Sequence, residues 1–301
     1  MVITTHRMIS HSLIQKLLGP VPVLTDGAWG TQLQAQGLAP TDTPDLWNLS
    51  QPGKVTEVAR AYVEAGSQII LTNTFGGNRF RLAEVHAANR VAEINEAGAR
   101  LSRAVAGGNV LVFASIGPSG KMLINGDVTA DELFAAFSEQ AAALARGGAD
   151  GLVVETMSDL EEAALAVRAA KATGLPVVAS MVFDSGKDHD RTMMGTTPEQ
   201  AAAGLVAAGA DVIGSNCGQG IAGFVKICAR LKAAAPDCPI WIKGNAGLPK
   251  VVSGKAIYET TPQEFASFIP ALRDAGANFI GGCCGTSPEF IREASQRLHG
   301  K

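Results

Sequence analysis

Short apolar runs recur along this chain, and each follows a small turn built from alanine and glycine. Four stretches share the pattern: EAGSQIILTNT, RGGADGLVVET, AAGADVIGSNC and DAGANFIGGCC. An alanine-rich stretch of helical period precedes the turn, as in DELFAAFSEQAAALARGGAD, so that glycine ends a helix and a buried strand begins. The repeated unit is therefore a helix, a tight turn and a strand.

Eight such runs are candidate strands, separated by segments long enough for helices: 21–24, 68–72, 110–115, 151–155, 176–182, 211–215, 240–244 and 278–282. Uninterrupted apolar strands that alternate with helices indicate a parallel sheet covered on both faces. Eight units in 301 residues predict a single α/β domain over 1–301, folded as a closed (β/α)8 TIM barrel. The alternative is an open doubly wound sheet, but TDGAWGTQLQ does not match the glycine-rich fingerprint that usually follows its first strand.

Polar side chains gather where these predicted strands end. The carboxyl ends of all barrel strands meet at one face, which is where active sites form, so we expect the chemistry there. Two long segments, 184–197 and 244–261, follow the fifth and seventh strands at this face and are expected to gate or select ligands. The polar strand-end residues are Asp26, Thr72, Asn73, Ser115, Glu155, Asn216, Cys217, Asn245, Cys283 and Cys284.

The five cysteines are an odd number in a chain without a secretion signal, which favours reduced thiols over a disulfide framework. Cys228 falls in a helical run and Cys238 in a turn, and neither is assigned any chemistry. Cys217 ends the sixth strand, whereas Cys283 and Cys284 end the eighth. Three thiolates that meet at the barrel mouth predict a zinc site with three protein ligands and an open fourth position.

The stretch GGCCGT poses a geometric problem, because adjacent side chains of a strand point to opposite faces. Cys283 and Cys284 can bind one ion only if the backbone bends between them. Gly281, Gly282 and Gly285 flank the pair and are predicted to allow that bend. The alternatives are a redox-active vicinal pair or two small apolar side chains in a tight strand end.

Zinc bound by three thiolates is a poor Lewis acid for water but a good anchor for another thiol, which coordination deprotonates. Such a thiolate is suited to attack an electrophilic carbon. Asp26 and Glu155 would then act as an acid and base pair or neutralise a cationic group of the ligand, and backbone N–H groups near Gly27 would hold a carboxylate. The structural alternatives are a helix cap or turn former at Asp26 and a partner of a barrel lysine or arginine at Glu155.

Composition narrows the class of partner. Hydrophobic residues make up 47% of the chain and the formal charge is -3, with basic residues scattered rather than clustered. This distribution argues against binding to nucleic acid or to an anionic membrane surface. The absence of a long apolar segment predicts a cytoplasmic protein, and a small molecule is the expected ligand.

Taken together, the motifs TDGAWGTQL, TNTFGGNR, ASIGPSG, ETMSDLEEA, GSNCG and GGCCGTSPEFI resemble the zinc-dependent homocysteine S-methyltransferases along nearly the whole chain. That family includes the homocysteine module of cobalamin-dependent methionine synthase and the betaine-homocysteine and S-methylmethionine-homocysteine methyltransferases. The resemblance implies a (β/α)8 barrel, zinc on Cys217, Cys283 and Cys284, and methyl transfer to homocysteine sulfur for methionine biosynthesis. It also implies homocysteine binding near Asp26, Gly27, Thr72, Asn73, Ser115 and Glu155.

The methyl donor is less defined. TNTFGGN is most similar to the methionine synthase module, which favours a methyl-corrinoid carried by a separate protein; a small methyl-onium compound is the alternative. Betaine is less favoured, because the chain has two tyrosines and Thr156 stands where betaine enzymes carry an aromatic residue. The residues also leave open methylation of a different thiol, corrinoid-linked demethylation, or a non-catalytic zinc or redox dithiol module.

Overall fold

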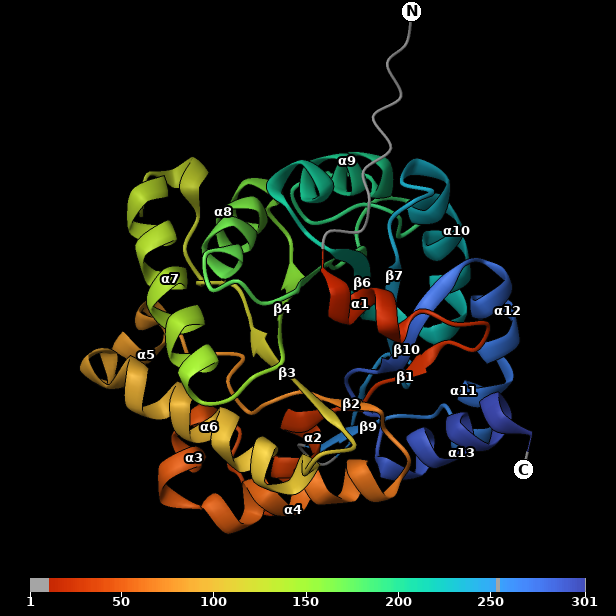
Figure 1. Ribbon diagram of the computed structural model, residues 1–301, viewed down its shortest axis with the longest axis horizontal. Helices are drawn as coiled ribbons and strands as arrows, with labels where there is room; N and C mark the ends of the chain where they lie inside the picture. The colour runs from red at the N-terminus through yellow and green to blue at the C-terminus, as the bar shows by residue number, and fades with distance from the viewer. Residues whose placement is uncertain (1–10, 253–254, 301) are drawn as a thin grey trace, which may run out of the picture.

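The computed structural model describes residues 11–252 and 255–300, and its centre is a parallel sheet of eight strands (Figure 1). The strand order is β1-β10-β7-β6-β5-β4-β3-β2, and a parallel bridge between Thr25 and Ile69 joins the two ends. The predicted (β/α)8 TIM barrel is therefore confirmed, with a strand in each predicted segment. The strands are β1 (Val23–Leu24), β2 (Ile69–Ile70), β3 (Leu111–Ile116), β4 (Gly151–Met157), β5 (Val177–Met181), β6 (Val212–Gly220), β7 (Ile240–Asn245) and β10 (Ala277–Gly282).

Helices surround the strands as a ring (Figure 1). Local sequence defines where they begin: Thr129 and Thr197 each form a capping box, and proline occupies the first turn of five of the helices given below, α4, α9, α11, α12 and α13. The helices are α1 (Ser12–Leu17), α2 (Trp29–Ala35), α3 (Trp47–Ser50), α4 (Pro52–Glu64), α5 (Arg79–Ala83), α6 (Val91–Ala106), α7 (Ala130–Arg146), α8 (Leu160–Lys171), α9 (Pro198–Ala208), α10 (Phe224–Ala234), α11 (Pro262–Ser267), α12 (Ile269–Asp274) and α13 (Pro288–His299).

The inside of the barrel is filled with apolar side chains up to the level of the polar strand ends. Trp241 of β7 stacks on Phe113 of β3 with ring centroids 6.3 Å apart, and it also packs against Phe279 of β10. Ile14 of α1 is fully buried in the same cluster, and α1 directly precedes the amino end of β1. The amino end of the barrel is thus closed, and the carboxyl end is left for chemistry.

The two long segments at the carboxyl face differ in structure. Segment 244–261 contains an antiparallel hairpin of β8 (Lys250–Val252) and β9 (Lys255–Ile257), which the apolar pattern did not predict. Segment 184–197 is held against the outer helices by Arg230, whose guanidinium binds Asp190 at 2.5 Å and Glu199 at 2.7 Å. Among helices in the parts of the chain that the structure describes, none has the length and apolar character needed to cross a bilayer.

Candidate active site

The three strand-end cysteines meet at the carboxyl face of the barrel. Their Sγ atoms all lie within 4.8 Å of one another, and those of Cys217 and Cys284 are 3.7 Å apart. Cys217 comes from β6, and Cys283 and Cys284 follow β10; β7 lies between these two strands and pairs with both. All three residues are partly buried. The convergence predicted from strand-end positions is therefore present in the structure.

A break in strand register presents Cys217 to the other two thiols. Asn216 of β6 pairs with Lys243 of β7, whereas Gly220 pairs with Asn245, so β6 uses two extra residues over this interval. Cys217 lies in the left-handed region with φ of 60°, followed by Gly218 with φ of 82°. Because left-handed backbone is costly for a residue with a Cβ, this geometry marks a position constrained by its surroundings.

The glycines around the vicinal cysteines have two different roles. Gly285 has φ of 81° and provides the turn after Cys284, as predicted. Gly281 and Gly282 are not left-handed; a Cβ on Gly281 would lie 2.0 Å from Thr25 Oγ1, and one on Gly282 would lie 2.2 Å from Thr286 Oγ1. These two glycines are therefore needed for close packing of neighbouring segments, and not for the bend itself.

Backbone hydrogen bonds fix the turn that carries the two cysteines. The N–H of Cys283 donates to Gly244 O at 2.7 Å, and the N–H of Ala246 donates to Cys284 O at 2.9 Å. The hydroxyl of Thr286 donates to Cys283 O at 2.6 Å. The turn is thus joined to β7, which also pairs with the Cys217 strand, so that the three sulfurs are held by one rigid unit.

Proton affinity is unequal within the thiol cluster. Hydrogen bonds from Cys283 and Cys284 lower the pKa of Cys217 to about 3, whereas the contact with Cys217 raises the pKa of Cys284 to about 12. Two side-chain amides also approach the sulfurs: Asn245 Nδ2 lies 3.8 Å from Cys217 Sγ, and Asn216 Nδ2 lies 3.7 Å from Cys283 Sγ. Negative charge in the cluster is therefore held mainly on Cys217.

The donor set fits a soft metal ion. Three thiol sulfurs at this separation are the ligands that zinc and similar ions prefer, and no other group of three possible metal-binding side chains occurs in the described residues. Asn245 Oδ1 is buried and has no hydrogen-bond partner within the described structure, although the same amide contacts Cys217. Buried carbonyl oxygens normally have a partner, and an ion held by the sulfurs would provide one.

Asp26 lies at the floor of the site as part of a buried charge pair. One carboxylate oxygen contacts Lys243 Nζ, and the other accepts from Trp29 Nε1 and from the N–H of Leu71, each at 2.7 Å. Asp26 is 0% and Lys243 1% exposed. Lys243 was not singled out from the sequence, although a lysine in the apolar strand IWIKGN, two residues after the inward-facing Trp241, is the signal that identifies it.

Gly27 lies where no side chain fits. A Cβ at this position would be 2.8 Å from Thr286 O and 2.9 Å from the ring of Tyr62. The Tyr62 hydroxyl in turn donates to Ala28 O at 2.8 Å or to Thr286 O at 3.0 Å. Glycine therefore allows the turn after β1 to pack directly against the cysteine-bearing turn after β10.

Glu155 is the second carboxylate of the site, and a chain of hydroxyl groups supports it. Its Oε1 accepts from Ser115 Oγ, and the N–H of Ser115 donates to Thr72 Oγ1 at 3.0 Å. Thr72 Oγ1 also contacts Thr74 Oγ1 at 2.5 Å. Burial raises the pKa of Glu155, and the charge of Lys243 opposes that rise. With two carboxylates and one lysine, the fully ionised group has a net charge of -1, which suits a cationic ligand group.

Asn73 was predicted for the site, but its side-chain amide binds a neighbouring loop. Its Nδ2 donates to Pro44 O at 2.7 Å and to Asn48 Oδ1 at 3.0 Å, so the amide joins the strand end to the 44–48 segment. The other predicted residues lie at or just after the carboxyl ends of β1, β2, β3, β4, β6, β7 and β10.

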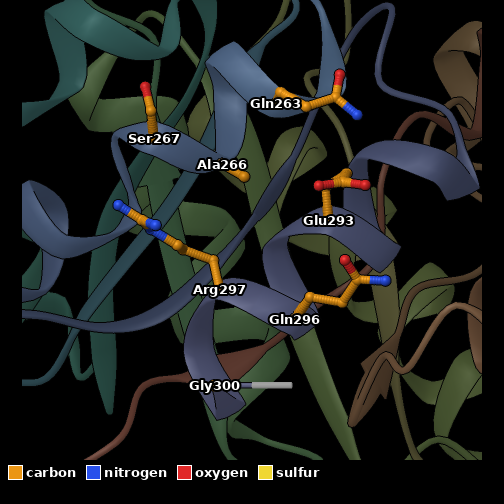
Figure 2. Close-up of a pocket in the computed structure, with 7 residues that line it drawn as sticks. All are labelled: Gln263, Ala266, Ser267, Glu293, Gln296, Arg297 and Gly300. Carbon is orange, nitrogen blue, oxygen red and sulfur yellow. The ribbon is translucent and has the colours of Figure 1, made fainter.

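A separate hollow lies on the outside of the barrel between α11 and α13 (Figure 2). None of the residues predicted for the site lines it, and its walls carry no cysteine. It is therefore unrelated to the thiol cluster. Its lining residues are Gln263, Ala266, Ser267, Glu293, Gln296, Arg297 and Gly300.

The sequence of the chain matches a known family over most of its length. Residues 23–298 match the family model described as homocysteine S-methyltransferase. The chain is 32% identical over 289 residues to methionine synthase of Mycobacterium tuberculosis and 31% identical to that of Mycobacterium leprae; each match covers 90% of this chain but 24% of the relative. The chain thus spans about a quarter of the length of these relatives.

Solved structures share the fold over the whole barrel. The metallated form of the homocysteine methyltransferase MmuM from Escherichia coli matches with a TM-score of 0.77 at 23% identity, covering 96% of this chain and 99% of that one. The oxidised form of the same protein matches with a TM-score of 0.75 at 24% identity, covering 97% and 100%.

Proposed function

The chain belongs to the homocysteine S-methyltransferase family, and from this premise we propose that it is a zinc-dependent enzyme that methylates homocysteine to methionine. Residues 1–301 would form one homocysteine-binding barrel domain. The observation that carries the proposal is the meeting of three sulfur atoms beside a buried group of two carboxylates and one lysine, Asp26, Glu155 and Lys243, with a net charge of -1 when fully ionised. A metal-bound thiol and an ammonium are the two groups of homocysteine that such a site would bind together.

We propose that Cys217, Cys283 and Cys284 hold the zinc. When bound, zinc would lower the pKa of the incoming thiol so that it reacts as a thiolate at neutral pH. Asn245, whose amide contacts Cys217, would supply hydrogen bonding and a spare oxygen at the edge of the metal site. The turn after β10 would keep the sulfurs at fixed separation while the substrate enters and product leaves.

The protein's carboxylates would orient the amino acid end of the substrate. Glu155, held at one oxygen by Ser115, would accept a hydrogen bond from the substrate ammonium with the other. Lys243 neutralises much of the charge on Asp26, so Asp26 would act mainly by fixing the pocket floor and by adding negative potential. Backbone N–H groups near Gly27 would bind the substrate carboxylate, and Thr72 would act through Ser115.

For the methyl donor we propose a methyl-corrinoid carried by a separate protein. Six of the eight large apolar side chains that are exposed in the described chain lie in segments that join the carboxyl end of a barrel strand to the next helix of the ring. Their exposed fractions are 36% to 74%, and we propose that together they contact the donor protein. We call this set the apolar rim: Phe75, Met122, Ile124, Met193, Leu248 and Ile257.

Two further observations support a macromolecular donor. Met193 lies in segment 184–197 and Leu248 and Ile257 lie in segment 244–261, the two segments expected to select the donor. The relatives named methionine synthase are about four times longer than the matched region, so they have room for additional domains. A small methyl-onium donor remains the alternative, and it would need only the pocket and not the rim.

A donor panel tests the proposal. The zinc-loaded protein is incubated with homocysteine and, in turn, a methyl-corrinoid protein, free methylcobalamin, S-methylmethionine or betaine, and methionine is measured by mass spectrometry. Methionine formed from the corrinoid protein is the expected result. If no donor yields methionine, the acceptor assignment is wrong. If zinc keeps four protein ligands when homocysteine is added, a non-catalytic metal module is the better description.

A further inference from the structure

Asn216 of β6 joins three parts of the site. Its Oδ1 accepts from the N–H of Thr156 at 2.9 Å and from Ser180 Oγ at 2.7 Å. Its Nδ2 donates to Thr156 Oγ1 at 2.7 Å and approaches Cys283 Sγ at 3.7 Å. The side chain is 0% exposed. One buried amide therefore contacts both the strand of the site carboxylate and the thiol cluster.

Its main partner, Thr156, is held in an unfavourable backbone conformation. Thr156 has φ of 61°, a region that β-branched residues rarely adopt. Val154 pairs with Ala179 of β5 and Met157 pairs with Met181, so β4 carries one extra residue in this interval. This is a β-bulge, a feature that re-aims side chains next to active sites. Strain of this kind persists only where surrounding contacts over-determine it.

The bulge contains Glu155, the side chain that would bind the substrate ammonium in the proposed function. The N–H of Thr156 belongs to the same peptide group as the carbonyl of Glu155, so a bond to this N–H fixes the ψ angle of Glu155. Ser115 fixes the other end of the residue by its bond to Oε1. The Glu155 side chain is thus held at both its backbone and its carboxylate.

We propose that Asn216 is a positioning residue: it holds Thr156 in the left-handed conformation and so aims Glu155 at the substrate, while its amide also contacts Cys283. This inference rests on the proposed function, because it assigns Glu155 to the ammonium of homocysteine. The amide is suited to the task since it offers an acceptor to a backbone N–H and donors to a hydroxyl and a sulfur at once.

A rescue experiment tests this role. Asn216→Ala removes the two hydrogen bonds that hold Thr156. It is expected to raise the dissociation constant for homocysteine at least about 10-fold, because the bulge relaxes and the Glu155 carboxylate moves away from the position that binds the ammonium. Glycine adopts positive φ without a Cβ penalty. Adding Thr156→Gly to Asn216→Ala is therefore expected to recover most of the lost affinity, to within about 3-fold of wild type.

Three companion variants make the result specific. Thr156→Gly and Thr156→Ala both lose the hydroxyl, but only alanine keeps a strained Cβ, so alanine is expected to weaken homocysteine binding and glycine to leave it nearly unchanged. Ser180→Ala removes a contact of Asn216 with β5, opposite the bulge, while both hydrogen bonds between Asn216 and Thr156 remain, and it is the matched control. This pair of Thr156 variants decides the question even if Asn216→Ala does not fold.

The readouts are zinc per chain by elemental analysis, homocysteine binding to zinc-loaded protein by titration calorimetry, and the thermal unfolding midpoint. Zinc content retained in Asn216→Ala, with weakened homocysteine binding that glycine rescues, supports the role. Unchanged homocysteine affinity in Asn216→Ala, or equal affinities of Thr156→Gly and Thr156→Ala, overturns it while the proposed function stands. Wild-type protein that binds zinc but not homocysteine contradicts both.

Discussion

Lys243 and Asp26 form an ion pair inside the barrel although they are 217 residues apart in the chain. Their side chains are 2% and 0% exposed. Two charges at this depth are tolerated because each compensates the other and because Trp29 and Leu71 provide the remaining hydrogen bonds. Asp26 is therefore part of the structural floor of the site, as well as a proposed contributor to substrate binding.

Lys243→Met is expected to lower the free energy of unfolding by about 3 to 5 kcal/mol, because it leaves the Asp26 carboxylate buried and unpaired. The matched double variant, Asp26→Asn with Lys243→Met, removes both charges and should lose less free energy of unfolding than Lys243→Met alone. Urea denaturation of the three proteins measures the difference. Equal stability of Lys243→Met and wild type would contradict a charged pair at this position.

Asp26→Asn alone addresses the binding role of Asp26. Loss of one negative charge from the pocket is expected to weaken homocysteine affinity about 10-fold while zinc affinity stays near that of wild type. Calorimetry with homocysteine and a competition assay with a zinc chelator provide the two values. A parallel loss of both affinities would indicate that Asp26 acts only by supporting the fold.

Cys217→Ser and Cys283→Ser are each expected to reduce zinc affinity by more than about 100-fold and to abolish methyl transfer, since each removes one of three sulfur ligands. Cys228→Ser is the matched control, because Cys228 lies in α10 with its sulfur against the carbonyls of Leu272 and Ala275. Elemental analysis after dialysis checks the outcome. Zinc retained in both site variants would refute the three-sulfur site.

Asp45 is expected to make stability depend on pH. It is 3% exposed, its Oδ1 has no partner among the described residues, and burial raises its pKa from 3.8 to about 7, with Arg81 and the backbone of Gly76 opposing the rise. The folded protein keeps this proton up to about pH 7, whereas the unfolded chain releases it near pH 4. The contribution of Asp45 is thus complete below pH 4 and is lost as the pH rises to about 7.

Asp45→Asn removes this titration. The variant is expected to be more stable than wild type by roughly 2 to 4 kcal/mol near pH 8 and about equally stable near pH 4. Urea unfolding at the two pH values measures the change, and Asp42→Asn, at an exposed neighbouring position, is the control. A variant that is less stable than wild type near pH 8 would show that the carboxylate is ionised and satisfied.

Gly281→Ala is expected to destabilise the protein by about 1 to 3 kcal/mol, because the new Cβ would overlap Thr25 Oγ1. Gly30→Ala is the matched control: it lies in α2 with no atom within 4 Å of a Cβ, and it should be neutral or stabilising by up to about 1 kcal/mol. Thermal unfolding compares the two. Similar effects of both substitutions would argue against the close packing described around Gly281.

Leu248→Glu and Ile124→Glu test the apolar rim. Each is expected to raise the KM for a corrinoid protein donor about 10-fold or more without changing the KM for homocysteine, because charge disrupts apolar contact between macromolecules. Phe134→Glu, on the exposed side of α7, is the control for a general effect of adding charge. Steady-state kinetics give both constants. An equal rise in the two KM values would point to damage in the pocket itself.

The sequence was sufficient to predict the eight strands, because each is an uninterrupted apolar run between helical segments. Strand-end position also predicted the meeting of Cys217 with Cys283 and Cys284. Lys243 could not be assigned in this way, since its inward orientation is explained only by Asp26, which follows β1 and is distant in sequence. The sequence shows that a lysine interrupts an apolar strand, but it does not show which residue neutralises the lysine's charge.

The backbone irregularities were also beyond local prediction. Thr156 and Cys217 adopt positive φ, yet neither residue type favours it, so the tertiary contacts of Asn216 and of the thiol cluster override local preference. Asn73 was expected at the pocket, but its amide is used by the 44–48 segment. An amide can take either of two partners, and the choice depends on how the loops pack. The spacing of apolar residues in the sequence does not predict that packing.

Barrel closure has a consequence for how the protein is made. β1 pairs with β10 through the register of Val23 with Phe279, two residues that are 256 positions apart in the chain. The turn that carries Asp26 therefore meets the cysteine turn only when this long-range pairing forms. Closing the barrel and completing the site are thus one and the same folding event.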